Sequence, residues 1–183
     1  MKKISERILH GGNFLSLKES TFLTNDGKEV KWESVTRKKN SSVIVMIGIL
    51  KPSNRYVLIR QFRPPINNFV LGFPAGISEG KNISEEALRE LKEETGYAGR
   101  IVEVSPSFKL SPALIDDDVH VVSLEIDEND PRNKKPVQEL EPEEQIEVVL
   151  CEKDGIKDLI SSEVKAGRTV ASGLWYLMFG SYT

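Results

Sequence analysis

The densest chemical signal in the sequence is a cluster of carboxylates on one predicted helix. The stretch from Ser84 to Thr95 is rich in good helix formers, and Gly96 is suited to end a helix in the left-handed conformation. At about 100° per residue, four glutamates fall within an arc of roughly 100°, and these are Glu86, Glu90, Glu93 and Glu94. Like charges at i,i+3 and i,i+4 positions destabilise a helix by about 0.2–0.5 kcal/mol per pair. Folding alone does not need this cluster.

A hard divalent cation would remove the repulsion. Mg²⁺ binds carboxylate oxygens and usually keeps waters and phosphate oxygens in its remaining positions. The glutamates therefore predict a cradle for Mg²⁺, or for Mn²⁺ in its place, that carries a phosphorylated ligand. The simpler interpretation is a solvated acidic helix face, which runs of charge usually are. We expect Asn82 or Ser84 to cap the start of the helix by accepting hydrogen bonds from free backbone amides.

The residues around the helix resemble a known signature. Gly76, followed by the run Arg89-Glu90-Leu91-x-Glu93-Glu94-x-Gly96-Tyr97, is similar to the Nudix box. The Nudix box is the loop–helix–loop signature of hydrolases that act on nucleoside diphosphates linked to another moiety. The resemblance favours the metal site over the solvated face.

This resemblance implies roles for individual residues. Glu90 and Glu94 would be metal ligands with Glu93 as a third, and the carbonyl of Ala75, just before the box glycine, would join them. Arg89 would serve catalysis as a structural partner that holds a box glutamate in place. Its alternative is a salt bridge facing solvent, which contributes only about 0–1 kcal/mol.

One part of the signature departs from the family. The loop from Gly76 to Lys81 is one residue short, and Lys81 stands where the family has a glutamate. That glutamate is usually not an essential metal ligand. The departure therefore bears on loop support and on the number of bound metal ions more than on activity itself.

Composition argues against several classes of protein. The chain has 183 residues, enough for one domain with a sizeable core and a small appendage. With 25 basic and 28 acidic residues, it has no positive surplus for binding nucleic acid. Apolar runs such as residues 43–50 are too short to span a bilayer, and residues 1–12 make a poor signal peptide. The single Cys151 fits a reducing compartment, so we expect a cytoplasmic protein, or also a nuclear one in a eukaryote.

The first forty residues predict a small antiparallel sheet. Phe14–Leu17 and Ser20–Leu23 indicate one strand, Asn25-Asp26-Gly27 a hairpin turn, and Val30–Val35 the returning strand. A three-stranded meander of this size is marginal by itself, so it should pack on the main domain or on a second subunit. We place a domain boundary near residues 38–40, which divides the chain into residues 1–40 and 41–183.

The remainder predicts a mixed sheet that carries helices, an α/β or α+β domain. Residues 127–143 are polar, acidic and contain proline, which favours a mobile surface loop. The Nudix resemblance narrows the fold to an α/β/α sandwich. The predicted strands are Ser42–Leu50, Arg55–Gln61, Phe69–Phe73, Gly99–Val104, Val119–Ile126 and Gln145–Cys151, and the closing helices are Gly155–Ser161 and Val170–Phe179.

A wider resemblance extends over nearly the whole chain. Four stretches stand in the order seen in ADP-sugar pyrophosphatases of the eukaryotic type, which hydrolyse ADP-ribose: Trp32-Glu33-Ser34-Val35, Gln61-Phe62-Arg63-Pro64-Pro65, Phe73-Pro74-Ala75-Gly76 and Glu144-Gln145-Ile146-Glu147-Val148. This resemblance implies a homodimer whose N-terminal strands pair or swap, with both subunits building each site. Residues 1–40 would then be the dimerisation domain and residues 41–183 the hydrolase domain.

The same resemblance suggests how a nucleotide-sugar would be held. Trp32 would stack on adenine with Glu33 accepting from its amino group, and Phe14 would stand opposite as a second aromatic. The alternative for Trp32 is burial at a contact between strands. Arg37 and Arg63 each have the planar fork that grips phosphate oxygens, and two prolines after Arg63 fix its loop.

A loop carboxylate completes the predicted site. In the resembling enzymes a glutamate just before the Ile-Glu-Val strand takes a proton from the attacking water. Glu144 aligns best with it, and Glu143 is one step away. The alternative is that residues 139–144 form a solvated acidic loop.

The sequence therefore predicts a Mg²⁺-dependent hydrolase that cleaves ADP-ribose or a related ADP-sugar to AMP and ribose 5-phosphate. Ala113 stands where the family tends to have glycine, in a loop near the terminal sugar, so another nucleoside diphosphate sugar is a rival substrate. A non-catalytic module that binds ADP-ribose is the rival from a different class. Residues 116–118 lack the spacing of a Ca²⁺-binding loop.

Overall fold

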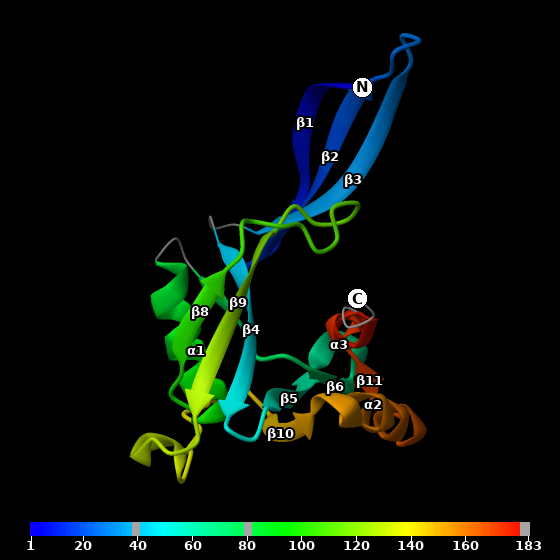
Figure 1. Ribbon diagram of the computed structural model, residues 1–183. Helices are drawn as coiled ribbons and strands as arrows, with labels where there is room; N and C mark the ends of the chain where they lie inside the picture. Colours follow the sequence, from blue (N-terminus) through cyan, green and yellow to red (C-terminus); the bar gives the residue numbers. More distant parts are fainter. Residues whose placement is uncertain (38–40, 79–81, 180–183) are drawn as a thin grey trace.

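A computed structural model describes residues 1–37, 41–78 and 82–179. These residues form two sheets and three α-helices (Figure 1). The strands are β1 (Lys2–Gly11), β2 (Leu15–Leu23), β3 (Glu29–Arg37), β4 (Ser42–Lys51), β5 (Arg55–Arg63), β6 (Asn68–Gly72), β7 (Ala75–Ser78), β8 (Arg100–Val104), β9 (Asp118–Asp127), β10 (Ile146–Glu152) and β11 (Thr169–Val170), and the helices are α1 (Ile83–Thr95), α2 (Ile156–Lys165) and α3 (Ser172–Phe179).

The larger sheet is mixed, as the sequence predicts. Its strand order is β11-β6-β5-β4-β9-β8, with β10 beside β5 and β7 beside β4. The central pair, β4 and β9, is parallel from Ser42 opposite Asp118 to Lys51 opposite Asp127. Strand β4 is the apolar run of the sequence, and alternate side chains on it (Ile44, Met46 and Leu50) are at most 1% exposed. A strand buried in this way forms a rigid centre for the elements around it.

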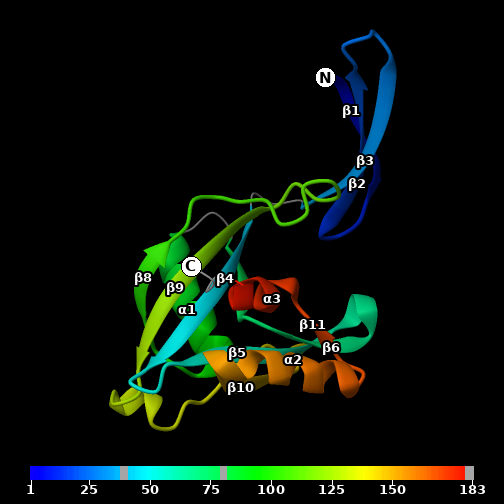
Figure 2. The same ribbon diagram turned by 45° about the vertical axis from the view of Figure 1, so that its right-hand side comes forward.

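Helices cover both faces of this sheet, which confirms the predicted α/β/α arrangement. On one face Ala87 and Leu91 of α1 pack on Met46, Val57 and Leu124. On the other face the buried residues of α2 and α3 pack against β5 and β6, and the cluster includes Tyr56, Leu58, Leu71, Ile156 and Leu174. The two views place α1 on one side and the α2–α3 pair on the other (Figures 1 and 2).

Both ends of α1 are fixed by specific contacts. Of the two predicted caps, Asn82 is the one used: its Oδ1 accepts from the Ser84 amide at 3.0 Å. Gly96 ends the helix with φ of 76°, in the left-handed region. A Cβ at Gly96 would lie 2.4 Å from the Val137 amide nitrogen, so a later segment of the chain packs tightly on the helix end.

The N-terminal sheet stands apart from the main domain. Strands β1, β2 and β3 pair antiparallel and project away from the larger sheet (Figures 1 and 2). Side chains of β1 are exposed along its whole length. The sheet is attached by the Val35 amide, which donates to the Leu114 carbonyl at 2.7 Å, and by a Lys18–Asp116 ion pair at 2.5 Å. The predicted boundary at residues 38–40 lies outside the described residues.

Three local features differ from the sequence prediction. The last helix begins at Ser172 rather than Val170, because Val170 pairs in parallel with Leu71 as part of β11. The helix predicted at residues 155–161 continues to Lys165. Residues 76–78, which we expected to belong to a loop, lie in β7 because this strand pairs antiparallel with β4. Pairing with distant strands decides the first and third of these features, and sequence periodicity does not reveal it.

The acidic segment at residues 127–143 is anchored at defined points. Asn133 is buried, and its Nδ2 donates to the carbonyls of Ala98 and Asp127, both at 2.9 Å. Gln138 Nε2 donates to the Glu94 carbonyl at 2.6 Å. These contacts fix the segment against the C-terminal end of α1. None of the helices within the described ranges is long and apolar enough to cross a membrane.

Glu163 gives a test of the fold that does not involve the candidate site. Its carboxylate is 1% exposed and receives two bonds from Arg168 (2.6 and 3.0 Å) and two from Arg60 (2.7 and 3.0 Å). These arginines, Arg168 most of all, lower the pKa of Glu163 to about 2. Glu163→Gln should destabilise the protein at pH 7 by about 3 kcal/mol, because one partner of a buried ion cluster is removed.

The pH dependence has a definite sign. A depressed carboxyl pKa stabilises the folded state above the unfolded pKa, and this stabilisation is lost as pH falls toward the folded value near 2. The difference in unfolding free energy between wild type and Glu163→Gln should therefore shrink between pH 5 and pH 3 in urea titrations. Glu147→Gln, which removes an exposed partner of Arg60, is the control and should cost less than about 1 kcal/mol. Equal stability of Glu163→Gln and wild type at pH 7 would contradict this assignment.

Candidate active site

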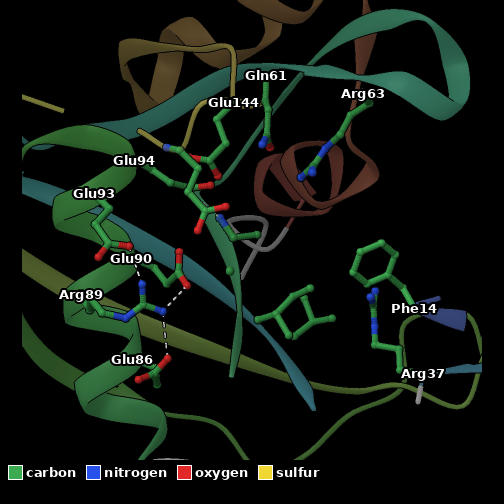
Figure 3. Close-up of a pocket in the computed structure, with 15 residues that line it drawn as sticks. Phe14, Arg37, Gln61, Arg63, Glu86, Arg89, Glu90, Glu93, Glu94 and Glu144 are labelled. Atoms are coloured by element: carbon green, nitrogen blue, oxygen red, sulfur yellow. Dashed lines mark hydrogen bonds and ion pairs between the residues drawn. The ribbon is translucent and has the colours of Figure 1, made fainter. Parts of the chain in front are cut away.

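A cavity of about 640 Å³ opens where α1, the end of β5 and the base of the N-terminal sheet meet. Its two walls carry opposite charge (Figure 3). The acidic wall is formed by glutamates of α1 and of the segment before β10: Glu86, Glu90, Glu93, Glu94, Glu141 and Glu144. The opposite wall holds Arg37, Arg63 and Phe14. A ligand with both phosphate groups and an aromatic base matches this division.

Glu94 is the most deeply buried acid of the site. Glu94 is 2% exposed, and its Oε2 accepts a hydrogen bond from the Ala75 amide at 3.0 Å. Burial raises the pKa of Glu94 to about 8, and the nearby Glu90 and Glu144 charges add to this shift. A cation bound at this carboxyl would favour its charged form and oppose the shift.

Glu90 lies directly over the backbone of Gly76. A Cβ at Gly76 would be 2.3 Å from Cδ of Glu90, so any larger residue would displace this carboxylate. Burial raises the pKa of Glu90, although Arg89 opposes the shift. The box glycine is therefore required by a close approach between the strand β7 and the helix α1.

Arg89 connects three of the acids along α1. It donates to Glu86 at 2.9 Å and to Glu90 at 2.5 Å, and it also bonds Glu93 one turn further along (Figure 3). One guanidinium thus offsets part of the repulsion among three carboxylates. This geometry agrees with the expectation that Arg89 holds a box glutamate, rather than standing alone in solvent.

The oxygen ligands suit a hard divalent cation, but they are not already arranged around one point. In the described part of the chain, no three His, Cys, Asp or Glu side chains converge as a ready-made metal site. The reason is visible at Arg89, which bonds Glu86, Glu90 and Glu93, while Glu94 bonds the Ala75 amide. Carboxylate and carbonyl oxygens are the ligands that Mg²⁺ prefers. The residues present that would hold it are Glu90, Glu94, Glu93 and the Ala75 carbonyl.

Glu144 reaches the cavity from a short arch, residues 139–145, which backbone hydrogen bonds hold at both ends. On one side the Glu139 amide donates to the Glu93 carbonyl at 2.9 Å, and on the other the Phe62 amide donates to the Gln145 carbonyl at 3.0 Å. Within the arch, Glu144 Oε2 accepts from the Glu141 amide at 2.9 Å. Glu144 lines the cavity and Glu143 does not, which favours the first of the two predicted candidates.

The basic wall is held by contacts with the main domain. Arg37 Nε donates to Oδ2 of Asp117 at 2.9 Å, and the Asp117 side chain is 8% exposed. This bond leaves the terminal guanidinium nitrogens directed at the cavity beside Phe14 (Figure 3). Arg63 lies at the end of β5, followed by Pro64. Phe14 is 82% exposed, so one face of its ring is open.

The single chain does not bring Trp32 and Glu33 to this cavity. Trp32 is 53% exposed, and its Nε1 donates to the Ala113 carbonyl at 3.0 Å. It lines a separate cavity of about 420 Å³ between the N-terminal sheet and the loop before β9. Glu33 lies opposite Glu19 on β2. The nucleotide-binding role of Trp32 and Glu33 stays a prediction, and it needs a second subunit. Lys81, which replaces a glutamate of the family signature, lies outside the described residues.

Sequence reasoning missed Gln61 and Glu141, which line the cavity. A signal for Gln61 was available, because residues two apart on a strand share a face. Val57 and Ile59 are buried on the face of β5 that carries Arg63, and Gln61 lies between Ile59 and Arg63. For Glu141 no such signal exists, because the arch is not periodic.

Comparisons with known proteins agree with this geometry. The sequence matches the family described as NUDIX domain over residues 39–165. It is 34% identical to the ADP-sugar pyrophosphatase of Mus musculus over 160 residues, 83% of this chain and 73% of the mouse protein. It is 40% identical to the ADP-ribose pyrophosphatase of Saccharomyces cerevisiae over 149 residues, 76% of this chain and 64% of the yeast protein.

Among solved structures, the crystal structure of an ADP compounds hydrolase has the same fold. The TM-score is 0.68 at 18% sequence identity, over 88% of this chain and 84% of that one. The similarity includes the N-terminal region in part, since the covered share of 88% is more than residues 39–183 alone would supply.

Cation binding at this site should release a proton. Because the pKa of Glu94 is about 8, this carboxyl is mostly protonated at pH 7 and must ionise to ligate Mg²⁺. Calorimetry of Mg²⁺ binding in two buffers with different ionisation heats should give a release of about one proton at pH 7. The affinity should rise with pH and level off above pH 8.

Two variants show whether the released proton comes from Glu94. Glu94→Gln should remove both the proton release and most of the affinity. Glu85→Gln changes an exposed glutamate of the first helical turn that does not line the cavity, and it should behave as wild type. A binding heat that does not depend on the buffer would contradict the assignment of Glu94.

Proposed function

The chain belongs to the Nudix family, and from this premise we propose that it is a Mg²⁺-dependent pyrophosphatase of ADP-ribose or a related ADP-sugar. The observation that carries the proposal is the pair of oppositely charged walls around one cavity. A diphosphate linked to a base and a sugar presents negative charge at its centre and neutral groups at both ends. The names of the mouse and yeast relatives favour ADP-sugars over other diphosphates.

The reaction is hydrolysis of a phosphoanhydride. Water attacks phosphorus, the bond to the bridging oxygen breaks, and the products are AMP and ribose 5-phosphate. Nudix hydrolases generally use divalent metal ions, and a bound Mg²⁺ supplies neutralisation of the phosphate charge and activation of water. The metal-holding residues would be Glu90, Glu94, Glu93 and the Ala75 carbonyl.

Residues of the chain bind the phosphates, accept the proton and position the metal ligands. Arg37 and Arg63 hold phosphate oxygens from the side opposite the acids, since guanidinium groups bind them in bidentate fashion. Glu144 accepts a proton from the attacking water, and its place on a short arch lets the bound substrate adjust it before chemistry. Arg89 fixes the rotamers of Glu90 and Glu93 through direct bonds.

A homodimer would complete the adenine side of the site. Phe14 lines the cavity edge with an open face, and the described residues that line the cavity include no second aromatic. The exposed β1 strand carries Ile4 (46%), Ile8 (57%) and Leu9 (39%), which suits a buried contact. We propose that residues 1–40 form a dimerisation domain that brings Trp32 and Glu33 of one subunit to the cavity of the other.

A non-catalytic ADP-ribose-binding module is the second candidate. It is favoured by one observation, namely that no three acids among the described residues form a ready-made metal site. Hydrolysis of another nucleoside diphosphate sugar is a third, because Phe14 lines the cavity and Ala113 holds Trp32 through its carbonyl, so both can affect which ligand fits. Assays of AMP release from a panel of nucleotide-sugars, with and without Mg²⁺, separate the three.

Glu90→Gln distinguishes catalysis from binding. The variant keeps the size of the side chain and removes its charge, so turnover of ADP-ribose should fall about 10³-fold. The dissociation constant of ADP-ribose should change by less than threefold. Turnover is measured as AMP release and binding by calorimetry, with Glu85→Gln as the control. A wild-type protein that binds ADP-ribose but releases no AMP with Mg²⁺ would establish the binding module instead.

Trp32→Ala tests the shared site. Stacking of a base on an aromatic side chain contributes about 1–3 kcal/mol, so KM for ADP-ribose should rise at least fivefold with kcat nearly unchanged. Tyr176→Ala removes an exposed aromatic from α3 and is the control. The proposal also requires a dimer by light scattering. A monomeric protein, or an unchanged KM in Trp32→Ala, would rule out the shared adenine site.

A further inference from the structure

Gln61 is a buried polar residue whose side-chain oxygen receives no hydrogen bond from the described residues. It is 8% exposed, and its Oε1 is one of two buried side-chain atoms without a hydrogen-bond partner in the described part of the chain. The other is Oγ of Ser78, which does not line the cavity. Gln61 does line it, and its amide points into the cavity between Glu144 and Arg63 (Figure 3). A buried acceptor without a partner costs stability.

The backbone holds this amide in a fixed place. Gln61 lies within β5, opposite Ile146 of β10 on one side and Val70 of β6 on the other. It is therefore on an interior strand, whose main chain moves less than a loop. The next residue bonds the chain immediately after Glu144, through the Phe62 amide and the Gln145 carbonyl at 3.0 Å. Gln61 and Glu144 are thus held in register with each other.

The neighbours of Gln61 indicate which partner its oxygen lacks. Once Glu94 has ionised to ligate the cation, it is an acceptor like an ionised Glu144, and the phosphate oxygens of a diphosphate are also acceptors. Arg63 is a donor, but its fork suits phosphate. The group that must come close to both Glu144 and the phosphorus, and that carries two donor hydrogens, is the attacking water.

We propose that Gln61 is a catalytic residue that orients this water, an inference that rests on the proposed function. Its Oε1 accepts one hydrogen of the water while the Glu144 carboxylate accepts the other. The water oxygen attacks phosphorus, the bond from phosphorus to the bridging oxygen breaks, and the bridging oxygen leaves with the other phosphate. The proton passes to Glu144 and then to solvent, and Gln61 keeps its hydrogen bond without gaining a proton.

A neutral amide suits this task better than a carboxylate. Glu90, Glu94 and Glu144 already face the same space, and burial raises the pKa of the first two. A further negative charge at residue 61 would repel the phosphates and compete with Glu144 for the proton. An amide oxygen accepts a hydrogen bond with neither effect.

The test separates catalysis from stability with Gln61→Met. Methionine has a similar length and no strong acceptor, so kcat should fall about 100-fold with KM within twofold of wild type. The melting temperature should stay equal or rise, because an unpartnered buried oxygen is removed. Ser78→Ala is the matched control: it removes the other unpartnered oxygen and should leave kcat unchanged.

A second variant covers the case in which Gln61→Met does not fold. Gln61→Asn keeps the amide but withdraws it by about 1.5 Å, one bond length, and kcat should fall at least tenfold. A kcat within threefold of wild type in either folded variant overturns the proposal, as does a rise in KM alone, which would indicate a binding role.

The substrate in these assays is whichever diphosphate the wild type hydrolyses in the panel. If that substrate is not an ADP-sugar, the proposed function fails while the Gln61 measurement still decides the inference. If wild type hydrolyses ADP-ribose and Gln61→Met does so equally well, the inference alone fails. A wild type that hydrolyses no diphosphate overturns both.

Discussion

The structure depends on one electrostatic constraint, the confinement of partly buried carboxyl groups around one cavity. Glu90 and Glu94 lie one helical turn apart, and both have raised pKa values because burial removes water from them. Glu144 adds a third carboxyl group from a different segment. Such an arrangement lowers stability unless a cation joins it. This loss of stability arises at the candidate active site, where Arg37 and Arg63 face the acids across the cavity.

The surrounding elements keep the acids together. The parallel pair β4–β9 and the apolar face of α1 fix the helix on the sheet, and β7 brings Gly76 and the Ala75 amide to the helix. Arg89 offsets part of the repulsion along the exposed edge of α1. Gln138 ties the segment before Glu144 to the end of the same helix. Remote parts of the chain thus converge on one helical turn.

Local signals made much of this predictable. The apolar run of β4, the helix around the glutamates and the stop at Gly96 each reflect rules that act within a few residues, and these elements form where they are predicted. The rest depends on contacts between distant segments. Strand β7 exists because β4 offers it an edge, and Gln61 faces the cavity because β10 and β6 hold β5 on both sides. The separation of Trp32 from Phe14 in one chain follows from the projecting N-terminal sheet, which no local pattern reveals.

The central claim concerns where a cation and a diphosphate would meet. A crystal structure of the protein with Mg²⁺ and a non-hydrolysable ADP-ribose analogue tests it most directly. The account predicts Mg²⁺ at about 2.0–2.1 Å from its oxygen ligands, with Glu90 and Glu94 among them and the phosphates between the ion and the arginines Arg37 and Arg63. A structure in which both glutamates keep their present contacts, with the analogue and the ion bound elsewhere, would contradict it.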